Sequence, residues 1–259
     1  MVRFWKEKSW KNNPPRLKNK RDEKRSPKKE SGKNMGNENK IILSLCGGTG
    51  AWEEPYRQHP DIYDVRNITL PEFDILKTEI LEKDIVFAGE HRRSVILKNK
   101  VYGILAAPPC IMFSLARTNA KKPRDLKEGF EVVNACLNII WSCMEIQQDT
   151  KRKTLPLRFW ALENPNGMLK YFLGKPAFEF NPYEFGHPYK KKTYLWGWFN
   201  EPKKENPIES KQPKFDMILN KDLAEIPEGY KRPEEMTERQ IRRSITPKGF
   251  AEAFFDSNR

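Results

Sequence analysis

The sequence has no long apolar run and few of the residues that bind metals. Its 259 residues contain no stretch of about 18 consecutive apolar residues, so we expect no transmembrane helix. Residues 1–11 are basic and have no apolar core, so we expect no secretory signal there. The 4 cysteines and 3 histidines form no CxxC pair and no zinc-ligand spacing, which predicts no metal site and a reducing compartment.

Most of the excess of basic over acidic residues lies at the N-terminus. Residues 1–40 hold 14 Lys and Arg against 5 Asp and Glu, a net charge of +9 in a chain whose total is +13. Because this segment has few aliphatic side chains, we predict a disordered basic tail over residues 1–40. Its composition fits a solvated tail and a tether for nucleic acid equally well.

Beyond the tail, short apolar runs alternate with segments that have helical spacing. We predict strands at residues 41–45, 63–70, 101–107, 159–162 and 193–199. We predict helices at residues 53–58 and 129–148, and a last helix that Thr246 caps and Pro247 begins. The alternation predicts an α/β fold in which residues 41–259 form one domain around a sheet with helices on both faces. Residues 80–97 are expected to form a hairpin or an excursion, and residues 200–240 an irregular excursion or a small subdomain.

A glycine-rich turn, SLCGGTGAW at residues 44–52, follows the first predicted strand. Gly48 and Gly50 would let the backbone approach a ligand closely, and the helix after them offers free N–H groups. A strand-to-helix turn also uses glycine for its geometry alone. The turn therefore predicts either a nucleotide-like cofactor site or a plain structural turn.

A cysteine and a glutamate each stand near the end of an apolar strand. Pro108 and Pro109 precede Cys110, where peptide dipoles would lower the pKa of the thiol and favour a nucleophile over a space-filling cysteine. Glu163, in the sequence ENP, can act as an acid or a hydrogen-bond partner, or can belong to an ordinary turn. Both are expected at the carboxyl edge of the sheet, where α/β proteins bind ligands.

In this order, the glycine turn, PPC followed by FS, and ENP resemble three motifs of the cytosine-C5 DNA methyltransferase family. Residues 186–197, GHPYKKKTYLWG, resemble its basic motif and the next strand, and residues 245–255, ITPKGFAEAFF, its last motif. The resemblance covers about residues 41–199 and 239–256. It implies a Rossmann-like methyltransferase fold with a mixed, mostly parallel sheet.

The resemblance also implies roles for individual residues. Cys110 would add to cytosine C6 while Glu163 contacts N3 and the exocyclic amine, assisted by Lys191 or Lys192. S-Adenosyl-L-methionine would be held by Leu45, Gly48, Thr49, Gly50, Trp52, Thr69, Asp74, Ile75 and Pro108. Substrate contacts would come from Ser114, Arg117, Asn164, Pro165 and Thr193, and the basic run that contains Arg117 and Arg124 would contact phosphates.

The chain departs from the family pattern at several positions. Ser44 stands where the family has an acidic residue, Cys46 where it has an aromatic one, and Thr193 where it has an arginine. Lys191 or Lys192 would have to supply the positive charge of that arginine, but a lysine lacks the bidentate guanidinium group. Residues 200–240, with 8 Lys and Arg against 10 Asp and Glu, are a poor reader of the major groove. We therefore expect low or short sequence specificity.

Together these features predict a DNA (cytosine-5-)-methyltransferase that acts as a monomer without a metal or a membrane. Its DNA would be single-stranded or would present a flipped cytosine. We expect it in the cytoplasm, that of a host cell if a phage encodes it, or in the nucleus of a eukaryotic host. Two alternatives stay open: a non-catalytic DNA-binding protein with this fold, and an adenine-N6 or cytosine-N4 methyltransferase. The second is disfavoured because Ala107 cannot accept an amino proton.

Overall fold

The structure, a computed structural model, describes residues 39–115, 123–145, 157–204, 207–208, 223–233 and 236–259. The chain divides into two units, Met1–Asn37 and Glu38–Arg259, and the described residues belong to the second. Nearly all of the predicted tail over residues 1–40 lies outside the described residues, as does much of the predicted 200–240 excursion.

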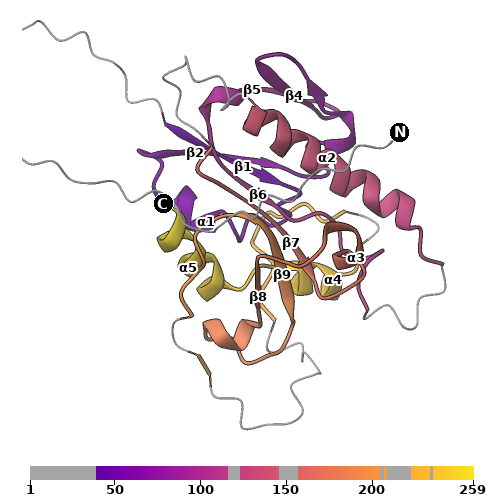
Figure 1. Cartoon of the computed structure of the whole chain (residues 1–259), viewed down its shortest axis with the longest axis vertical. Helices are drawn as coiled ribbons and strands as arrows, with labels where there is room; N and C mark the ends of the chain where they lie inside the picture. The colour runs from indigo at the N-terminus through magenta and orange to yellow at the C-terminus, as the bar shows by residue number, and fades with distance from the viewer. Residues whose placement is uncertain (1–38, 116–122, 146–156, 205–206, 209–222, 234–235) are drawn as a thin grey trace, which may run out of the picture. The chain divides into compact units, whose positions relative to one another are not determined.

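A six-stranded mixed sheet forms the centre of this unit (Figure 1). Its strands are β1 (Lys40–Leu45), β2 (Tyr63–Ile68), β6 (Val101–Ala106), β7 (Phe159–Pro165), β8 (Phe178–Phe180) and β9 (Thr193–Trp198). They lie in the order β2-β1-β6-β7-β9-β8; the first four are parallel, and β9 runs antiparallel to both of its neighbours. The predicted α/β class and mostly parallel sheet are confirmed, and the order is compatible with a Rossmann-like fold.

Strand β7 is longer than predicted. The apolar run ends at Leu162, but the strand continues through Pro165, and Glu163 and Asn164 pair with Leu195 and Tyr194 of β9. The strand extends beyond its apolar residues because they and the polar residues after them form hydrogen bonds with the antiparallel strand β9. The sequence of β7 alone does not reveal this pairing. Glu163 is therefore held within a strand and not on a turn after it.

Helices cover both faces of the sheet, as predicted (Figure 1). The α-helices are α1 (Glu54–Arg57), α2 (Leu126–Glu145), α3 (Lys170–Leu173), α4 (Glu238–Ser244) and α5 (Lys248–Asn258). Side chains alternate along β6, so that Ile104 packs in the apolar cluster of α2 and Leu105 in the cluster of α5. Among the helices of the described residues, none is both long and apolar enough to cross a membrane.

Helix α2 and a small second sheet share one face. Val133, Leu137 and Ile140 recur at helical spacing and are buried, and Asp125 caps the helix start by accepting from the Glu128 N–H at 2.9 Å. The predicted excursion at residues 80–97 is a three-stranded antiparallel sheet. Its strands are β3 (Glu79–Ile80), β4 (Asp84–Ala88) and β5 (Arg93–Leu97).

Helix α5 packs its aromatic side chains on the opposite face. Phe250 stacks on Phe180 with ring centroids 4.0 Å apart, and Phe254 lies edge-on to Phe159 at 5.7 Å. The prediction that Thr246 caps this helix is wrong. Pro247 has an extended ψ of 130°, and its carbonyl accepts the first helical bond from Ala251 at 3.0 Å, so Pro247 is the N-cap.

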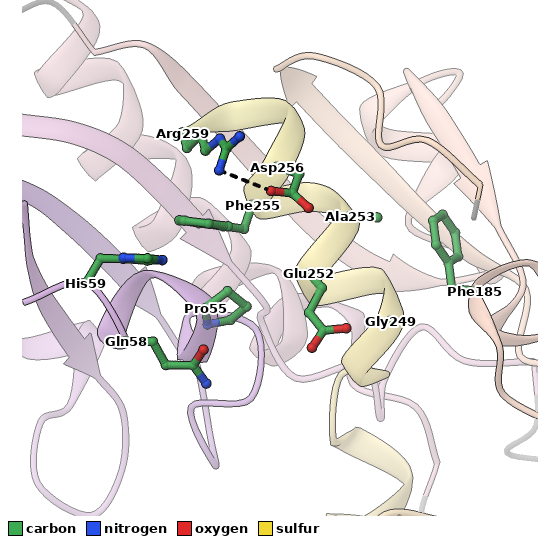
Figure 2. Close-up of a pocket in the computed structure, with 10 residues that line it drawn as sticks. All are labelled: Pro55, Gln58, His59, Phe185, Gly249, Glu252, Ala253, Phe255, Asp256 and Arg259. Carbon is green, nitrogen blue, oxygen red and sulfur yellow. Dashed lines mark ion pairs between the residues drawn. The ribbon is translucent and has the colours of Figure 1, made fainter. Parts of the chain in front are cut away.

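A pocket of about 410 Å³ lies on the α5 face (Figure 2). It is lined by Pro55, Gln58, His59, Phe185, Gly249, Glu252, Ala253, Phe255, Asp256 and Arg259. The His59 ring stacks on Phe255 with centroids 5.2 Å apart, and Arg259 pairs with Asp256 at 3.5 Å. None of these residues belongs to the candidate site that the sequence predicts.

The contact between Gly103 and Phe159 tests the packing of the central strands. The two residues pair across β6 and β7, and a Cβ at Gly103 would overlap the Phe159 ring. That ring is held by Tyr56 and Phe254 and has no room to move. We expect Gly103→Ala to lower the free energy of unfolding by about 1–3 kcal/mol in urea titrations.

A double-mutant cycle supplies the control for this prediction. In a Phe159→Leu background the same glycine change should cost clearly less, because the shorter side chain leaves room for the methyl group. An equal cost in both backgrounds would mean that the Phe159 ring is not the obstacle.

Candidate active site

The carboxyl ends of β1, β6 and β7 meet at one edge of the sheet. The N–H of Ala107, just after β6, donates to the carbonyl of Leu45 at the end of β1, at 2.9 Å. The glycine turn after β1, the turn that carries Cys110 after β6, and Glu163 near the end of β7 therefore share this edge. This is the edge where parallel α/β sheets bind ligands.

The turn that carries Cys110 is closed by backbone bonds and anchored by β7. The Cys110 carbonyl accepts from the N–H groups of Phe113 and Ser114 at 2.9 and 2.8 Å. Asn164 is fully buried, and its side-chain amide donates to the Pro108 carbonyl at 3.0 Å. Its Oδ1 has no hydrogen-bond partner among the described residues. Asn164 thus acts first as an anchor for the backbone before Cys110.

The segment after β7 lies against the same turn. Ser114 pairs with Gly167 in an isolated bridge, and the Met168 N–H donates to the Phe113 carbonyl at 2.9 Å. A Cβ at Gly167 would overlap that carbonyl, so the close approach requires glycine. The structure therefore brings the predicted substrate residues Ser114, Asn164 and Pro165 into one neighbourhood.

Arg124 holds the Cys110 turn from the other side. Its guanidinium donates to the carbonyls of Met112 at 2.9 Å and Ser114 at 2.8 Å. The predicted phosphate contact by Arg124 is therefore not supported, because the donors of this planar fork are directed at the protein's own backbone. Arg117, Lys121 and Lys122, the other predicted contacts of this run, lie outside the described residues.

Cys110 and Glu163 form an electrostatic cluster with Lys191. Burial raises the pKa of the Glu163 carboxyl, and the Lys191 ammonium opposes that shift. Burial likewise raises the pKa of the Cys110 thiol, Lys191 opposes it, Glu163 adds to it, and Arg243 lowers it least. The expected lowering of the Cys110 pKa is wrong, because desolvation outweighs the favourable charges and the backbone contact.

Lys191 is positioned by helix α4, which the sequence analysis missed. The Lys191 ammonium donates to the carbonyl of Arg243 at 3.0 Å, in the last turn of α4, where a cation is favoured by the free carbonyls. Thr237 and Gln240 form a capping box at its start. That Thr-x-x-Gln pattern is a signal the sequence offered.

The two neighbours of Lys191 have other partners. Lys192 is exposed and pairs with Glu179 at 3.1 Å, so the structure brings Lys191, but not Lys192, to Glu163. Thr193 is buried and donates its hydroxyl to the Lys191 carbonyl at 2.8 Å. Thr193 thereby fixes the backbone of Lys191.

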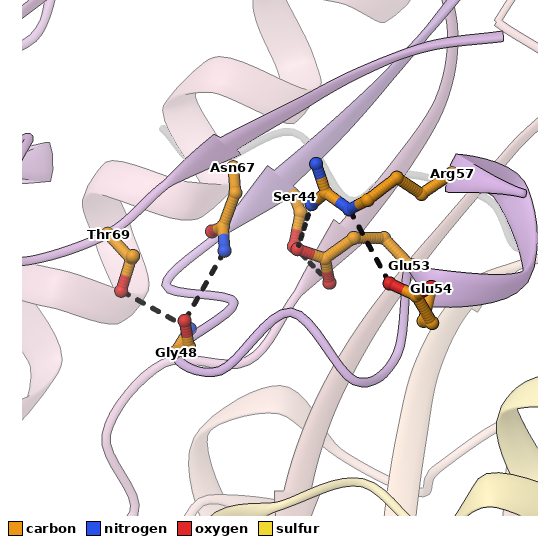
Figure 3. Close-up of polar contacts among 7 residues, drawn as sticks. All are labelled: Ser44, Gly48, Glu53, Glu54, Arg57, Asn67 and Thr69. Atoms are coloured by element: carbon orange, nitrogen blue, oxygen red, sulfur yellow. Dashed lines mark hydrogen bonds and ion pairs between the residues drawn. The ribbon is translucent and has the colours of Figure 1, made fainter. Parts of the chain in front are cut away.

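The glycine turn is held by hydrogen bonds at Gly48 (Figure 3). The Gly48 N–H donates to the Thr69 hydroxyl at 3.2 Å, and the Asn67 amide donates to the Gly48 carbonyl at 3.3 Å. Cys46, Gly48 and Gly50 all have positive φ. A Cβ placed at Gly48 would meet no described atom within 4 Å. Gly48 and Thr69, both predicted cofactor residues, therefore lie together beside open space.

A buried carboxyl group, Glu53, lies beneath this turn and was missed by the sequence analysis. Ser44 donates its hydroxyl to Glu53 at 3.1 Å, and Arg57 lies 3.5 Å from the other carboxyl oxygen (Figure 3). Burial raises the pKa of Glu53 to about 7. An acidic group thus lies beside Ser44, the position where the resembling family carries its own acid.

The other predicted cofactor residues are spread over both faces of the sheet. Leu45 and Ile75 pack in the cluster of α2, and Asp74 accepts from the Leu76 N–H at 3.0 Å. Trp52 packs in the opposite cluster, where Phe254 lies 5.4 Å away. Trp52 is thus a core residue on the other face from Ile75. Thr49 lies in the glycine turn after β1, and Pro108 lies in the turn after β6, where its carbonyl accepts from Asn164.

In comparisons with known proteins, no family model and no curated protein sequence matches the chain. Within the described ranges, no three His, Cys, Asp or Glu side chains gather into a group that could hold a metal ion. The candidate site is thus defined by its own geometry and by the motifs in its sequence.

The raised pKa of Glu53 predicts a pH-dependent stability. With a pKa of about 7 in the fold and 4.5 as its ordinary value, folded Glu53 keeps a proton that the unfolded chain has released. The stability from this group is full below pH 4.5 and is lost as the pH rises through 7. The free energy of unfolding of Glu53→Gln, compared with that of wild type at the same pH, should therefore be about 3 kcal/mol more favourable at pH 8 than at pH 5. Urea unfolding at both pH values measures this difference.

The exposed neighbour Glu54 supplies the control for that measurement. Glu54→Gln should show no such pH-dependent gain, because Glu54 is solvated in the folded protein. A Glu53→Gln difference from wild type that is the same at both pH values would contradict the burial argument.

The charges around Cys110 predict how fast its thiol reacts. Lys191→Met removes the cation that lowers the Cys110 pKa, so alkylation by iodoacetamide near neutral pH should slow. Glu163→Gln removes a negative charge and should speed it. Mass spectrometry of the Cys110 peptide gives rates against pH. Lys192→Met should leave the profile unchanged, because Lys192 pairs with Glu179, and an equal effect of both lysines would contradict the assignment.

Proposed function

We propose that the protein is an S-adenosyl-L-methionine-dependent DNA methyltransferase that modifies cytosine at C5. One observation carries the proposal: a thiol, a half-buried carboxyl and an ammonium group gather at the carboxyl edge of parallel strands. These are Cys110, Glu163 and Lys191, and their order in the chain is that of the resembling motifs. A nucleophile beside an acid and a cation suits addition to an electron-poor ring.

In the proposed reaction, Cys110 acts as a thiolate and forms a bond to C6 of cytosine. Burial raises the pKa of Glu163, which favours the protonated form that would donate toward N3, and its other oxygen would accept from the exocyclic amine. Lys191 compensates the negative charge that Cys110 and Glu163 share. Addition at C6 makes C5 a nucleophile toward the methyl group that a bound cofactor would supply. Loss of the C5 proton to water and return of the N3 proton to Glu163 would then restore the ring and expel Cys110 as a thiolate.

The glycine turn fits the proposed cofactor in part. The space beside Gly48, together with Thr49, Gly50 and Thr69, suits the methionine portion, and Asp74–Ile75 would lie by the adenine. Trp52 does not fit this role, since its ring is taken up in the core of the other face. When bound, S-adenosyl-L-methionine supplies an electrophilic methyl group. The mostly parallel sheet with helices on both faces supports the methyltransferase version of the fold.

A second candidate is a DNA-binding protein that has this fold without catalysis. The raised pKa of Cys110 and the core position of Trp52 favour it. Against it, Asn164, Gly167 and Arg124 are all used to hold the backbone around Cys110, which a binding protein has no need to position. The two candidates differ in whether Cys110 bonds to a base.

The decisive experiment is covalent trapping. A cytosine oligonucleotide with fluorine at C5, mixed with protein and S-adenosyl-L-methionine, should yield an adduct on the Cys110 peptide, because fluorine cannot leave as a proton does. Cys110→Ala should give none, and Glu163→Gln should form it about 10²–10⁴-fold more slowly.

Nucleoside mass spectrometry of DNA from expressing cells should show 5-methylcytosine with wild type only. Binding of both ligands without an adduct would favour the second candidate.

A further inference from the structure

Two aromatic side chains project from α3, directly after the strand that carries Glu163. Tyr171 is 75% exposed and Phe172 51% exposed, although both are large rings of the kind that proteins bury. Leu169, just before them, is fully buried, and Met168 and Leu173 pack on the α2 cluster. The short helix is therefore held in place while its two rings face outward.

These rings continue a surface that begins at the Cys110 turn. The bridge from Ser114 to Gly167 and the bond from Met168 to Phe113 join the segment of α3 to that turn. On the turn itself, Ile111 is 49% and Leu115 54% exposed. We define the stacking surface as Ile111 and Leu115 on the Cys110 turn together with Tyr171 and Phe172 on the segment bonded to that turn.

The segment that carries the two rings has charge of one sign. The Lys170 ammonium lies 5.3 Å from the centroid of the Tyr171 ring, and Lys175 follows on the same segment. No Asp or Glu occurs between Glu163 and Glu179. An exposed ring with a lysine over its face, and no carboxylate on its segment, suits a ligand that combines flat apolar groups with negative charge.

We propose that Tyr171 and Phe172, with Lys170, form a stacking platform for unpaired bases of single-stranded DNA on either side of the target cytosine. The bases would stack on the rings while the Lys170 ammonium moves from the Tyr171 face to a phosphate. Bases in a duplex stack on one another and offer no free face to these rings. The inference rests on the proposed function for the choice of DNA, and it adds that the preferred DNA is single-stranded.

The test measures binding of a strand that contains no cytosine. Fluorescence anisotropy of labelled oligo-thymidine with the full chain, at roughly 0.3 M salt, weakens charge contacts and leaves stacking. Tyr171→Ala should reduce affinity by roughly 5- to 150-fold, and Tyr171→Trp should keep it. Phe172→Ala should reduce affinity less, because part of its ring rests on Phe130 at 5.4 Å.

Trp198, at the end of β9, provides a matched control because it is another exposed aromatic side chain. It is 58% exposed but lies at the far end of β9, paired with Trp160, so Trp198→Ala should bind oligo-thymidine like wild type. Equal losses for Trp198→Ala and Tyr171→Ala, or no loss for Tyr171→Ala, would overturn the platform. Equal losses on a thymidine–adenosine duplex, or tighter binding of oligo-uridine, would overturn its assignment to single-stranded DNA.

Because oligo-thymidine offers no cytosine, this result is independent of methyl transfer. Loss of binding in Tyr171→Ala without any trapped adduct in wild type would uphold the platform and remove the proposed reaction. If wild type forms the adduct and Tyr171→Ala binds oligo-thymidine as tightly as wild type, the proposed reaction is upheld and the platform is removed.

Discussion

A single ammonium group, that of Lys191, is the charge on which the candidate site depends. Glu163 and Cys110 are both partly removed from water, and their charged forms are disfavoured by burial and, for Cys110, by the other negative group. Lys191 is the largest opposing influence on each of them. Without it, the pKa of both groups would rise further, and the nucleophilic thiolate of Cys110 would be harder to form.

The position of that ammonium depends on two long-range features of the fold. The antiparallel pairing of β9 with β7 brings the start of β9 beside Pro165, so that Lys191, two residues before β9, lies near Glu163. The last turn of α4 then holds the ammonium through the Arg243 carbonyl, 52 residues further along the chain. The reversed strand is therefore more than a closing element of the sheet, because a parallel strand here would start at the opposite edge.

The sequence analysis succeeded where local patterns decide and failed where distant segments meet. Apolar runs located β1 and β6 to within a residue, and helical spacing located α2. The length of β7 depends on its partner β9, and Trp52 belongs to the core because α5 supplies Phe254. Glu53 was missed because a carboxyl at the start of a helix usually lies in solvent, whereas here it lies beneath the glycine turn.

The polar side chains around Cys110 hold the backbone of its turn and are therefore not free to bind a ligand. Arg124 and Asn164 both carry side chains suited to contact a nucleic acid, yet both hold the backbone on either side of Cys110. A turn of three or four residues after two prolines has few contacts of its own, so it needs such supports to keep the thiol in place. If the supports come from the polar residues nearest the thiol, the ligand must be held by groups further out. The exposed rings and Lys170 of α3 are described groups in that position, and for this reason we propose that stacking on α3 would add to the base contacts of Glu163 in holding the substrate.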